Sequence, residues 1–171
     1  MPSIVIETER FVLRPLTEAD VSERYLQWLT ELEARRFITA ASSTTTLEIL
    51  RQYVRDFSNR QDAIFLGIFE RHTYLHIGNI KYDPVNHDMG YTIAGMLIGD
   101  SAYRGKGVGG EVFAASASWL QCHRNISQIV AGIHKENLGC IRMCEKVGFR
   151  IANTPHIPNP GSNALTMVWV L

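Results

Sequence analysis

The sequence has few cysteines and no arrangement of them that would build a scaffold. Its 171 residues contain three, Cys122, Cys140 and Cys144, an odd number without a Cys-x-x-Cys pair. A disulfide framework or a structural zinc site needs paired or closely spaced cysteines, so the sequence argues against both. We therefore expect a protein of the reducing cytoplasm that holds no metal.

Long hydrophobic runs and an excess of one charge are also missing. The longest apolar stretches, such as residues 63–69, fall far short of the roughly 20 residues that span a bilayer. Met1-Pro2-Ser3 lacks the basic segment that begins a signal peptide. Lys and Arg number 17, as do Asp and Glu, whereas nucleic-acid binders usually carry a large basic excess. We expect neither a membrane nor a nucleic acid as partner.

The remaining composition is that of one folded domain. The chain is 46% hydrophobic, has no internal repeat or low-complexity tract, and shows no linker, so residues 1–171 form a single domain. A turn is expected at residues 83–86, around a proline. Hydrophobic periodicity predicts, in chain order, strand 4–15, helices 21–32 and 47–57, strands 64–69, 74–80 and 89–98, helix 107–121, strand 129–133, helix 137–146 and strand 164–171. This order predicts an α/β (α+β) domain with a mixed sheet.

The most informative segment is a glycine-rich turn that leads into the predicted helix at residue 107. Four glycines lie within residues 105–110, so several backbone N–H groups can point outward without a Cβ in the way. The positive end of the helix dipole, Arg104 and Lys106 would add positive potential. The segment predicts a phosphate or pyrophosphate site, with a tight turn that binds nothing as the alternative.

Two common phosphate motifs do not fit this context. Residues 105–110 match G-x-G-x-x-G, but the dinucleotide fingerprint follows the first strand of a βαβ unit and needs an acidic residue about 20 positions later. The chain has Ile129-Val130-Ala131-Gly132 there. A Walker A motif needs Ser or Thr after its lysine, and Lys106 is followed by Gly107.

Two segments together match a different pattern. Arg104-Gly105-Lys106-Gly107-Val108-Gly109 is similar to a Q/R-x-x-G-x-G/A cofactor motif, and residues 137–149 contain an Asn followed by a helix that ends in E-K-x-G-F. Both motifs, their spacing and the order of elements resemble the GNAT superfamily of acetyl-CoA-dependent N-acetyltransferases. The resemblance implies a mostly antiparallel sheet of six or seven strands, splayed between the fourth and fifth strands and flanked by about four helices.

The resemblance also implies how acetyl-CoA, the co-substrate, is bound. Backbone groups of Leu97, Ile98 and Gly99 would meet the pantetheine arm. Asn137 holds the position whose side chain bonds that arm, a role compatible with helix N-capping. The pyrophosphate would lie on the turn, against Arg104, Gly105, Lys106, Gly107, Val108 and Gly109.

The implied reaction is attack of a neutral primary amine on the thioester. It needs a route for the amine proton, donors for the oxyanion and an acid for the leaving thiolate. Backbone N–H groups near Met96 or Leu97 would bind the oxyanion. Many family members carry a Tyr acid seven residues after the Asn, where this chain has Cys144. A thiol with a pKa near about 8.5 could serve, although a small buried core residue is the alternative.

The base is not evident, because the carboxylate that family members often carry on the strand before the motif is missing. His134, suited to titrate near neutral pH, and Asp88 are the candidates. A water relay is the other route. Because the carboxylate and the Tyr are missing, the alternative from another functional class is a non-catalytic protein that senses CoA or a nucleotide.

The acceptor is expected to be a small-molecule amine on the side of the two early helices and the loop 35–46. Residues 76–81 and 25–29 resemble a bacterial GNAT branch that acetylates amino sugars, some of them nucleotide-linked. The N-terminus of a ribosomal protein and a polyamine are the alternatives. Residues 1–99 carry 10 basic and 13 acidic side chains, and residues 100–171 carry 7 and 4, so the acceptor half suits an amine cation. A homodimer is left open.

Overall fold

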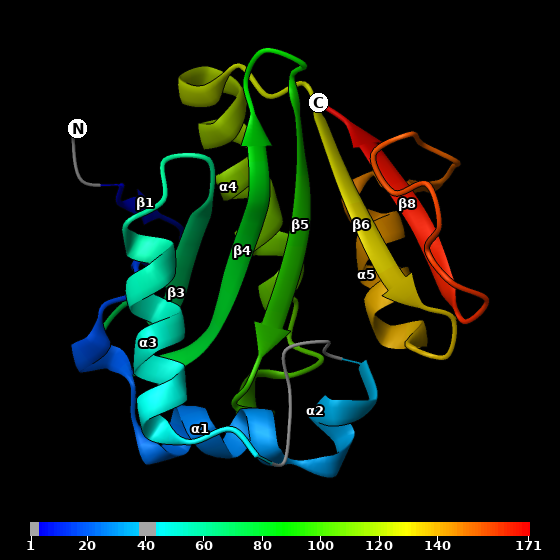
Figure 1. Ribbon diagram of the computed structural model, residues 1–171. Helices are drawn as coiled ribbons and strands as arrows, with labels where there is room; N and C mark the ends of the chain where they lie inside the picture. The colour runs from blue at the N-terminus through cyan, green and yellow to red at the C-terminus, as the bar shows by residue number, and fades with distance from the viewer. Residues whose placement is uncertain (1–3, 38–43) are drawn as a thin grey trace.

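The protein is built around one twisted sheet that opens in the middle (Figure 1). The computed structural model describes residues 4–37 and 44–171, and the sheet within them has eight strands in the order β1-β2-β3-β4-β5-β6-β8-β7. The strands are β1 (Ile6–Glu7), β2 (Phe11–Pro15), β3 (Ile64–Glu70), β4 (His76–Asn86), β5 (Tyr91–Ile98), β6 (Gln128–His134), β7 (Arg150–Ile151) and β8 (Ala164–Val170). The count exceeds the expected six or seven because β1 and β7, with two residues each, join the sheet at its edges.

Helices cover both faces of this sheet. The helices are α1 (Glu23–Thr30), α2 (Leu32–Phe37), α3 (Leu47–Ser58), α4 (Val108–Arg124) and α5 (Leu138–Val147). One apolar cluster joins the sheet to α4 and α5, and a second joins the other face to α1 and α3. Neighbouring strands pair antiparallel except β5 and β6, which are parallel. The predicted fold class, a mixed and mostly antiparallel sheet between helices, is confirmed.

The sheet opens between β5 and β6. Their ladder contains three residue pairs, from Tyr91–Gln128 to Ile93–Val130, and ends there. Beyond that point β5 continues along β4 to Ile98, while β6 continues along β8 to His134. Figure 1 shows the two strands diverging toward the lower end of the molecule. The splay expected between the fourth and fifth predicted strands therefore lies between β5 and β6.

The turn expected at residues 83–86 lies further along the chain. Strand β4 runs through Asn86, and the hairpin turn occupies residues 87–90. The register of β4 on β5 shifts between Tyr82 and Val85, so Asp83 and Pro84 sit in an irregularity of the ladder. Proline has no N–H to donate, and a bulge is a position where a strand tolerates it.

A histidine at the start of β4 attaches α1 to the sheet. The His76 ring stacks on Phe69 with centroids 5.0 Å apart and meets Tyr25 and Trp28 edge-on at 5.2 and 5.1 Å. Burial among these rings disfavours the charged imidazolium and lowers the pKa of His76 from 6.5 to about 4. In the folded protein His76 is therefore neutral at pH 7.

This burial predicts a loss of stability in mild acid. Between pH 6.5 and about 4 the unfolded chain binds a proton at His76 that the folded chain does not bind, so stability falls as the pH falls through this window. The contribution is about 2–3 kcal/mol at pH 4, from a shift of roughly two pKa units at 1.36 kcal/mol per unit. Urea unfolding of the wild type and of His76→Phe at pH 7, 5.5 and 4 measures it. The wild type should lose this amount more than the variant, and exposed His72→Gln should follow the wild type. Parallel pH profiles for the wild type and His76→Phe would contradict the assignment.

Candidate cofactor and acceptor site

The glycine-rich turn enters α4 with the geometry of an anion site. Gly105 and Gly107 have φ of +71° and +76°, the left-handed region that glycine adopts most readily. Gly107 is the N-cap of α4, which continues for 17 residues. The turn therefore directs backbone N–H groups and a long helix dipole outward, which fits a pyrophosphate.

An ion pair between distant parts of the chain holds this turn. One Glu111 carboxylate oxygen accepts from the Thr8 hydroxyl at 2.6 Å and the Arg10 amide at 2.9 Å, and the other accepts from Arg10 Nε at 2.7 Å. Arg10 Nη1 also donates to the Lys106 carbonyl at 3.0 Å. Burial raises the pKa of Glu111, but these bonds outweigh it and lower that pKa below its usual value. Arg10 thus neutralises a carboxylate beside the anion site, a role that sequence reasoning missed because no local motif marks it.

Arg104 ties the turn to the end of β5. Its Nε donates to the Ile98 carbonyl at 2.9 Å and its Nη2 to the Gly99 carbonyl at 3.0 Å. The predicted pyrophosphate residue therefore also fixes where the strand ends. On the far side of the gap, Asn137 caps α5, and its side-chain oxygen accepts from the Cys140 amide at 3.2 Å. The amide nitrogen of Asn137 can point elsewhere while this cap is kept.

The splay leaves backbone groups of β5 facing the gap. The Gly99 amide donates to Ile77 on the β4 side, whereas the Gly90 carbonyl accepts from the Gln128 amide on the β6 side. Backbone groups of a strand alternate between its two neighbours. Odd-numbered residues such as Leu97 and Gly99 thus turn to β4. Even-numbered ones turn to β6, and past Ile93 these are Ala94, Met96 and Ile98. Of the three predicted pantetheine contacts, Ile98 alone directs its backbone into the gap.

Cys144 lies inside the core rather than in the gap. Its side chain is 1% exposed and belongs to the apolar cluster between α4, α5 and the sheet. The neighbouring Cys140 and burial together raise the pKa of the Cys144 thiol far above its usual value. A thiol that holds its proton so tightly is a poor acid for a thiolate of ordinary pKa.

The two predicted bases lie at different ends of the site. Asp88 is exposed in the β4–β5 turn, and β5 runs eight residues from there to the phosphate turn, about 25 Å at roughly 3.3 Å per residue. His134 lies at the wide end of the gap, where its Nδ1 accepts from the Glu136 amide at 3.2 Å. A neutral imidazole has one acceptor nitrogen, and in His134 this bond occupies it. The structure does not bring Asp88, His134 and Cys144 together.

A bounded chamber lies on the opposite side of the gap from α4. The loop 152–163 covers its upper end: the His156 ring stacks on Tyr91 with centroids 3.6 Å apart, and Ile157 Cδ1 lies 3.7 Å from where a Cβ on Gly132 would be. Lower down, the Phe37 ring lies 5.4 Å from that of His134. Part of the predicted acceptor loop, residues 38–43, lies outside the described residues.

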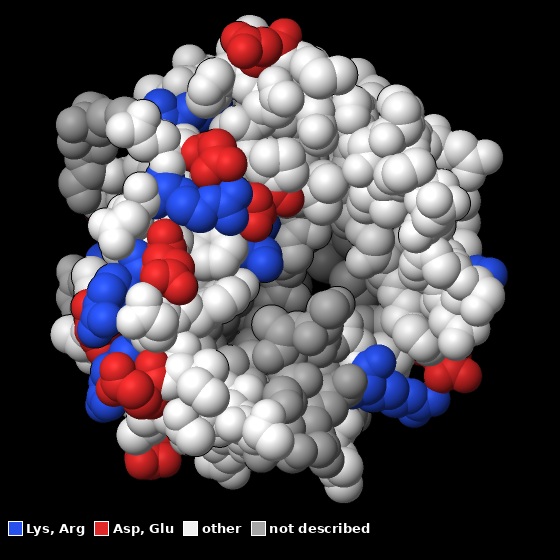
Figure 2. Space-filling view, viewed as in Figure 1, with Lys and Arg blue, Asp and Glu red and all other residues white. Residues whose placement is uncertain are grey.

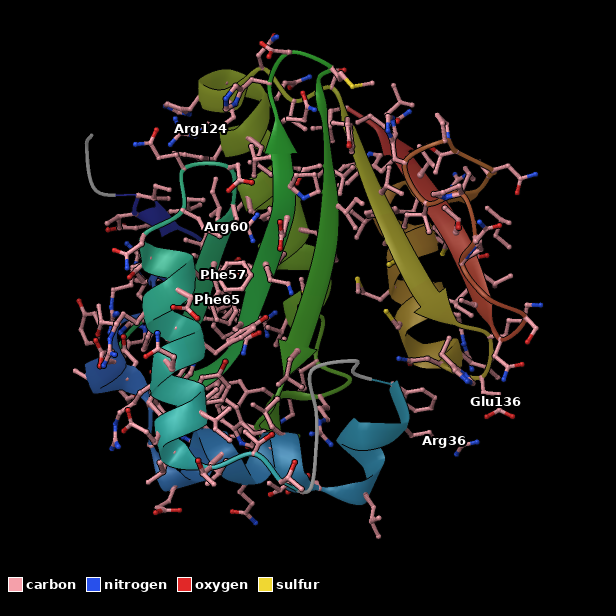
Figure 3. All side chains as sticks on the ribbon, viewed as in Figure 1. Arg36, Phe57, Arg60, Phe65, Arg124 and Glu136 are labelled. Carbon is pink, nitrogen blue, oxygen red and sulfur yellow. The ribbon has the colours of Figure 1, made fainter. Side chains whose placement is uncertain are left out.

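An exposed ion pair lies at the edge of this chamber. Arg36 of α2 donates to Glu136, which follows β6, and Figure 3 shows the two side chains reaching toward one another. A cavity of about 550 Å³ is lined here by Arg36, Phe37, Gly132, His134, Ile157, Pro160, Gly161, Ser162, Asn163 and Ala164. Figure 2 shows the same face of the molecule, with a hollow near its centre. The size is that of a small-molecule site.

Comparison with known families identifies the architecture. The family model described as an acetyltransferase (GNAT) domain matches residues 10–150. The chain belongs to the GNAT acetyltransferase family. It is accordingly an acetyl-CoA-dependent acyltransferase, and the splayed strands and glycine turn fit that co-substrate.

Solved structures share the GNAT fold along almost the whole chain. A GNAT acetyltransferase from Bacillus anthracis superposes with a TM-score of 0.80 at 18% identity, covering 98% of both chains. The ribosomal L7/L12 alpha-N-protein acetyltransferase RimL, in complex with coenzyme A, gives 0.83 at 15% identity and 98% of both chains. AAC(6')-Ib with paromomycin and acetyl-CoA gives 0.74 at 22% identity, covering 95% of this chain and 94% of that one.

The described residues meet the requirements of neither of two other kinds of site, a metal centre and a membrane span. In residues 4–37 and 44–171, no three His, Cys, Asp or Glu side chains are grouped so that they could hold a metal ion. The described helices include none that is long and apolar enough to cross a membrane.

The φ of Gly107 predicts a defect specific to CoA binding. Gly107→Ala places a Cβ in the left-handed region, at a cost of roughly 1–2 kcal/mol. We expect the turn to shift and the Kd for CoA to rise about tenfold, while the domain stays folded. Gly110→Ala is the matched control, because Gly110 is helical and its Cβ would meet Val147 at an ordinary 3.9 Å. Calorimetric titration of CoA into both variants checks this; equal affinities would show that the turn does not hold the cofactor.

Proposed function

We propose that this protein transfers the acetyl group of acetyl-CoA to the primary amine of a small molecule, with an amino sugar as the expected acceptor. The observation that carries the proposal is the gap between β5 and β6. The anion-binding turn at Gly105 and Gly107 lies toward α4, and on the other face a cavity lies against Gly132 and His134 of β6. This arrangement would let co-substrate and acceptor approach one carbon from opposite sides.

The residues that line the gap suit the two ends of the co-substrate. N–H groups of the turn from Gly105 to Gly109 would hold the pyrophosphate, and backbone groups of Ala94, Met96 and Ile98 would hold the pantetheine arm. Acetyl-CoA supplies an activated acyl carbon as a thioester. The Ala94 or Met96 N–H, fixed in direction by the β4 ladder, would stabilise the oxyanion that forms there.

A histidine of the loop 152–163 is suited to receive the amine proton. His156 is half-buried on Tyr91, at the start of the strand from which the gap opens. Among the predicted bases, Asp88 is exposed in the β4–β5 turn and His134 uses its acceptor nitrogen, so the half-buried His156 is the better base candidate. Because the pKa of Cys144 is raised, water is the better proton donor to the leaving thiolate.

The chamber favours a small acceptor over a polypeptide. Arg36, Phe37 and His134 line it, the Phe37 and His134 rings lie 5.4 Å apart, and aromatic faces suit the apolar faces of a sugar ring. AAC(6')-Ib, which shares the fold, is solved with the aminoglycosides paromomycin, ribostamycin and kanamycin. RimL is named for a ribosomal protein acceptor, which keeps a protein N-terminus as the competing class.

Release of free CoA thiol tests the activity directly. With acetyl-CoA and a panel of amino sugars, nucleotide-linked amino sugars, polyamines and N-terminal peptides, we expect turnover with amino sugars above the other classes. Preference for the peptides would assign the protein-acetylating alternative. Tight CoA binding with no thiol release from any amine would overturn the proposal and assign a sensor.

The role of His156 predicts a loss of rate rather than of cofactor affinity. His156→Gln keeps a polar side chain of similar length but removes the base, so kcat should fall about 100-fold with the Kd for CoA unchanged. His123→Gln, at the remote end of α4, serves as the control and should retain the wild-type rate. If kcat is unchanged in His156→Gln, His156 is not the base, and water receives the proton of the amine.

A further inference from the structure

We propose that the acceptor carries an anionic group, a carboxylate or a phosphate, which Lys81 binds beside the reacting amine. The inference rests on the proposed acetyl transfer and names a property of its acceptor. The inference is based on three observations: the position of Lys81, the groups that contact its ammonium, and the ion pairs of the surrounding charged side chains.

Lys81 lies next to the part of β5 that no longer pairs with β6. In the β4–β5 ladder it is the direct partner of Gly95, two residues past the last β5–β6 pair at Ile93. Gly95 is exposed, and no atom of the described residues lies within 4 Å of a Cβ built there. Gly95 lies on the same face of β5 as Leu97, which packs against α1 and α3. The exposed face of Gly95 next to Lys81 is therefore on the acceptor side of the sheet.

The Lys81 ammonium is held in place by aromatic side chains. Its Nζ donates to the Tyr53 hydroxyl at 3.0 Å and lies 5.8 and 5.1 Å from the ring centroids of Tyr53 and Phe57. These rings line the side of α3 that faces the sheet, and Figure 3 shows Phe57 between α3 and β4. An ammonium has three N–H donors, and this hydrogen bond uses one.

The neighbouring carboxylates are engaged with other cations. Asp62 and Asp83 both pair with Arg60, and Glu136 pairs with Arg36. Among the ion pairs of the described residues, none includes Lys81. A half-buried cation without a counter-ion is unfavourable, so the site gains when a ligand supplies the anion. Figure 2 shows basic atoms at the rim of the central hollow toward α3, and an uncharged wall over β6 and β8.

This arrangement selects among the acceptor classes. A polyamine or a polycationic sugar would bring its charges close to Lys81, where like charges repel. An acceptor with a carboxylate or phosphate next to its amine would instead form a charge-assisted bond with the free donors. An anion next to the amine raises the pKa of that amine. When Lys81 pairs with the anion, this effect is reduced, so more of the amine is the neutral nucleophile.

Matched acceptors and variants test the inference. We would measure kcat/KM by thiol release for an unsubstituted amino sugar, its phosphate ester and its uronic acid, with spermidine as the polycation. The wild type should prefer at least one anionic acceptor, and the preferred one tells a phosphate site from a carboxylate site. Lys81→Met, which keeps the length of the side chain, should lower kcat/KM for that acceptor about 10- to 100-fold and leave the neutral sugar within about twofold. Lys81→Arg should restore most of the preference.

The control removes an equal charge elsewhere. Arg124 lies over Trp119 at the C-terminal end of α4, and Figure 3 places it far from the chamber. Arg124→Met should behave as the wild type, and thermal unfolding should show all variants folded. Turnover that does not distinguish anionic from neutral sugars, or that is insensitive to Lys81→Met, would overturn the inference while leaving acetyl transfer intact. If no amine is acetylated by the folded wild type, acetyl transfer itself fails and the inference fails with it.

Discussion

The ladder between β5 and β6 ends after Ile93 and Val130, and the position of every functional group depends on this end. A parallel ladder that continued would join the backbone groups of Ala94, Met96 and Ile98 to β6 and close the passage. It ends there because β5 follows β4, β6 follows β8, and the two pairs of strands diverge (Figure 1). The β4 ladder holds β5 through Ile98, and β8 holds β6 at every residue from Gln128 to His134. The free edge is thus a stable feature of the fold, and its groups are available to a ligand that is itself a chain of amides.

The anion-binding turn contains a conflict that long-range contacts resolve. The helix dipole stabilises a carboxylate in the first turn of a helix. The negative charge of Glu111 would, however, repel a pyrophosphate at the N-terminus of α4. Thr8 and Arg10, more than 100 residues earlier in the chain, bind that carboxylate. Its charge is neutralised without loss of the helix start, and the same arginine reaches the Lys106 carbonyl. The sheet edge at β1 and β2 therefore supports the cofactor side even though it lies outside the glycine motif.

What the sequence could predict is what local chemistry determines. The glycines of residues 105–110 predict a turn at a helix start, and Asn137 predicts a helix N-cap. In each case the residue type and its neighbours determine the backbone conformation. The sequence predicts the end of β4 six residues too early, at residue 80 rather than Asn86. Asp83 and Pro84 are usual turn residues, and only pairing with β5 shows that they form an irregularity within a strand. The positions of the acid and base candidates depend on contacts between distant parts of the chain. Cys144 was chosen by its spacing from Asn137, but its burial depends on α4, α5 and the sheet together. His156 lies in a proline-rich loop with no periodicity, and its stacking on Tyr91 joins positions 65 residues apart.

The distribution of charge is also difficult to predict from the sequence, because it depends on which side chains pair in the folded protein. The acidic balance of residues 1–99 predicts an acceptor side that attracts cations, but a sum over a segment assumes that its charges act together. In the structure Asp20 pairs with Arg14, Glu18 with Arg55, and Asp62 and Asp83 with Arg60. Paired, exposed charges are screened by solvent and salt and contribute little at a distance. Among the described side chains on this face, Lys81 is a half-buried charge that takes part in none of these ion pairs. Its charge is therefore less compensated than the net acidity of this half suggests.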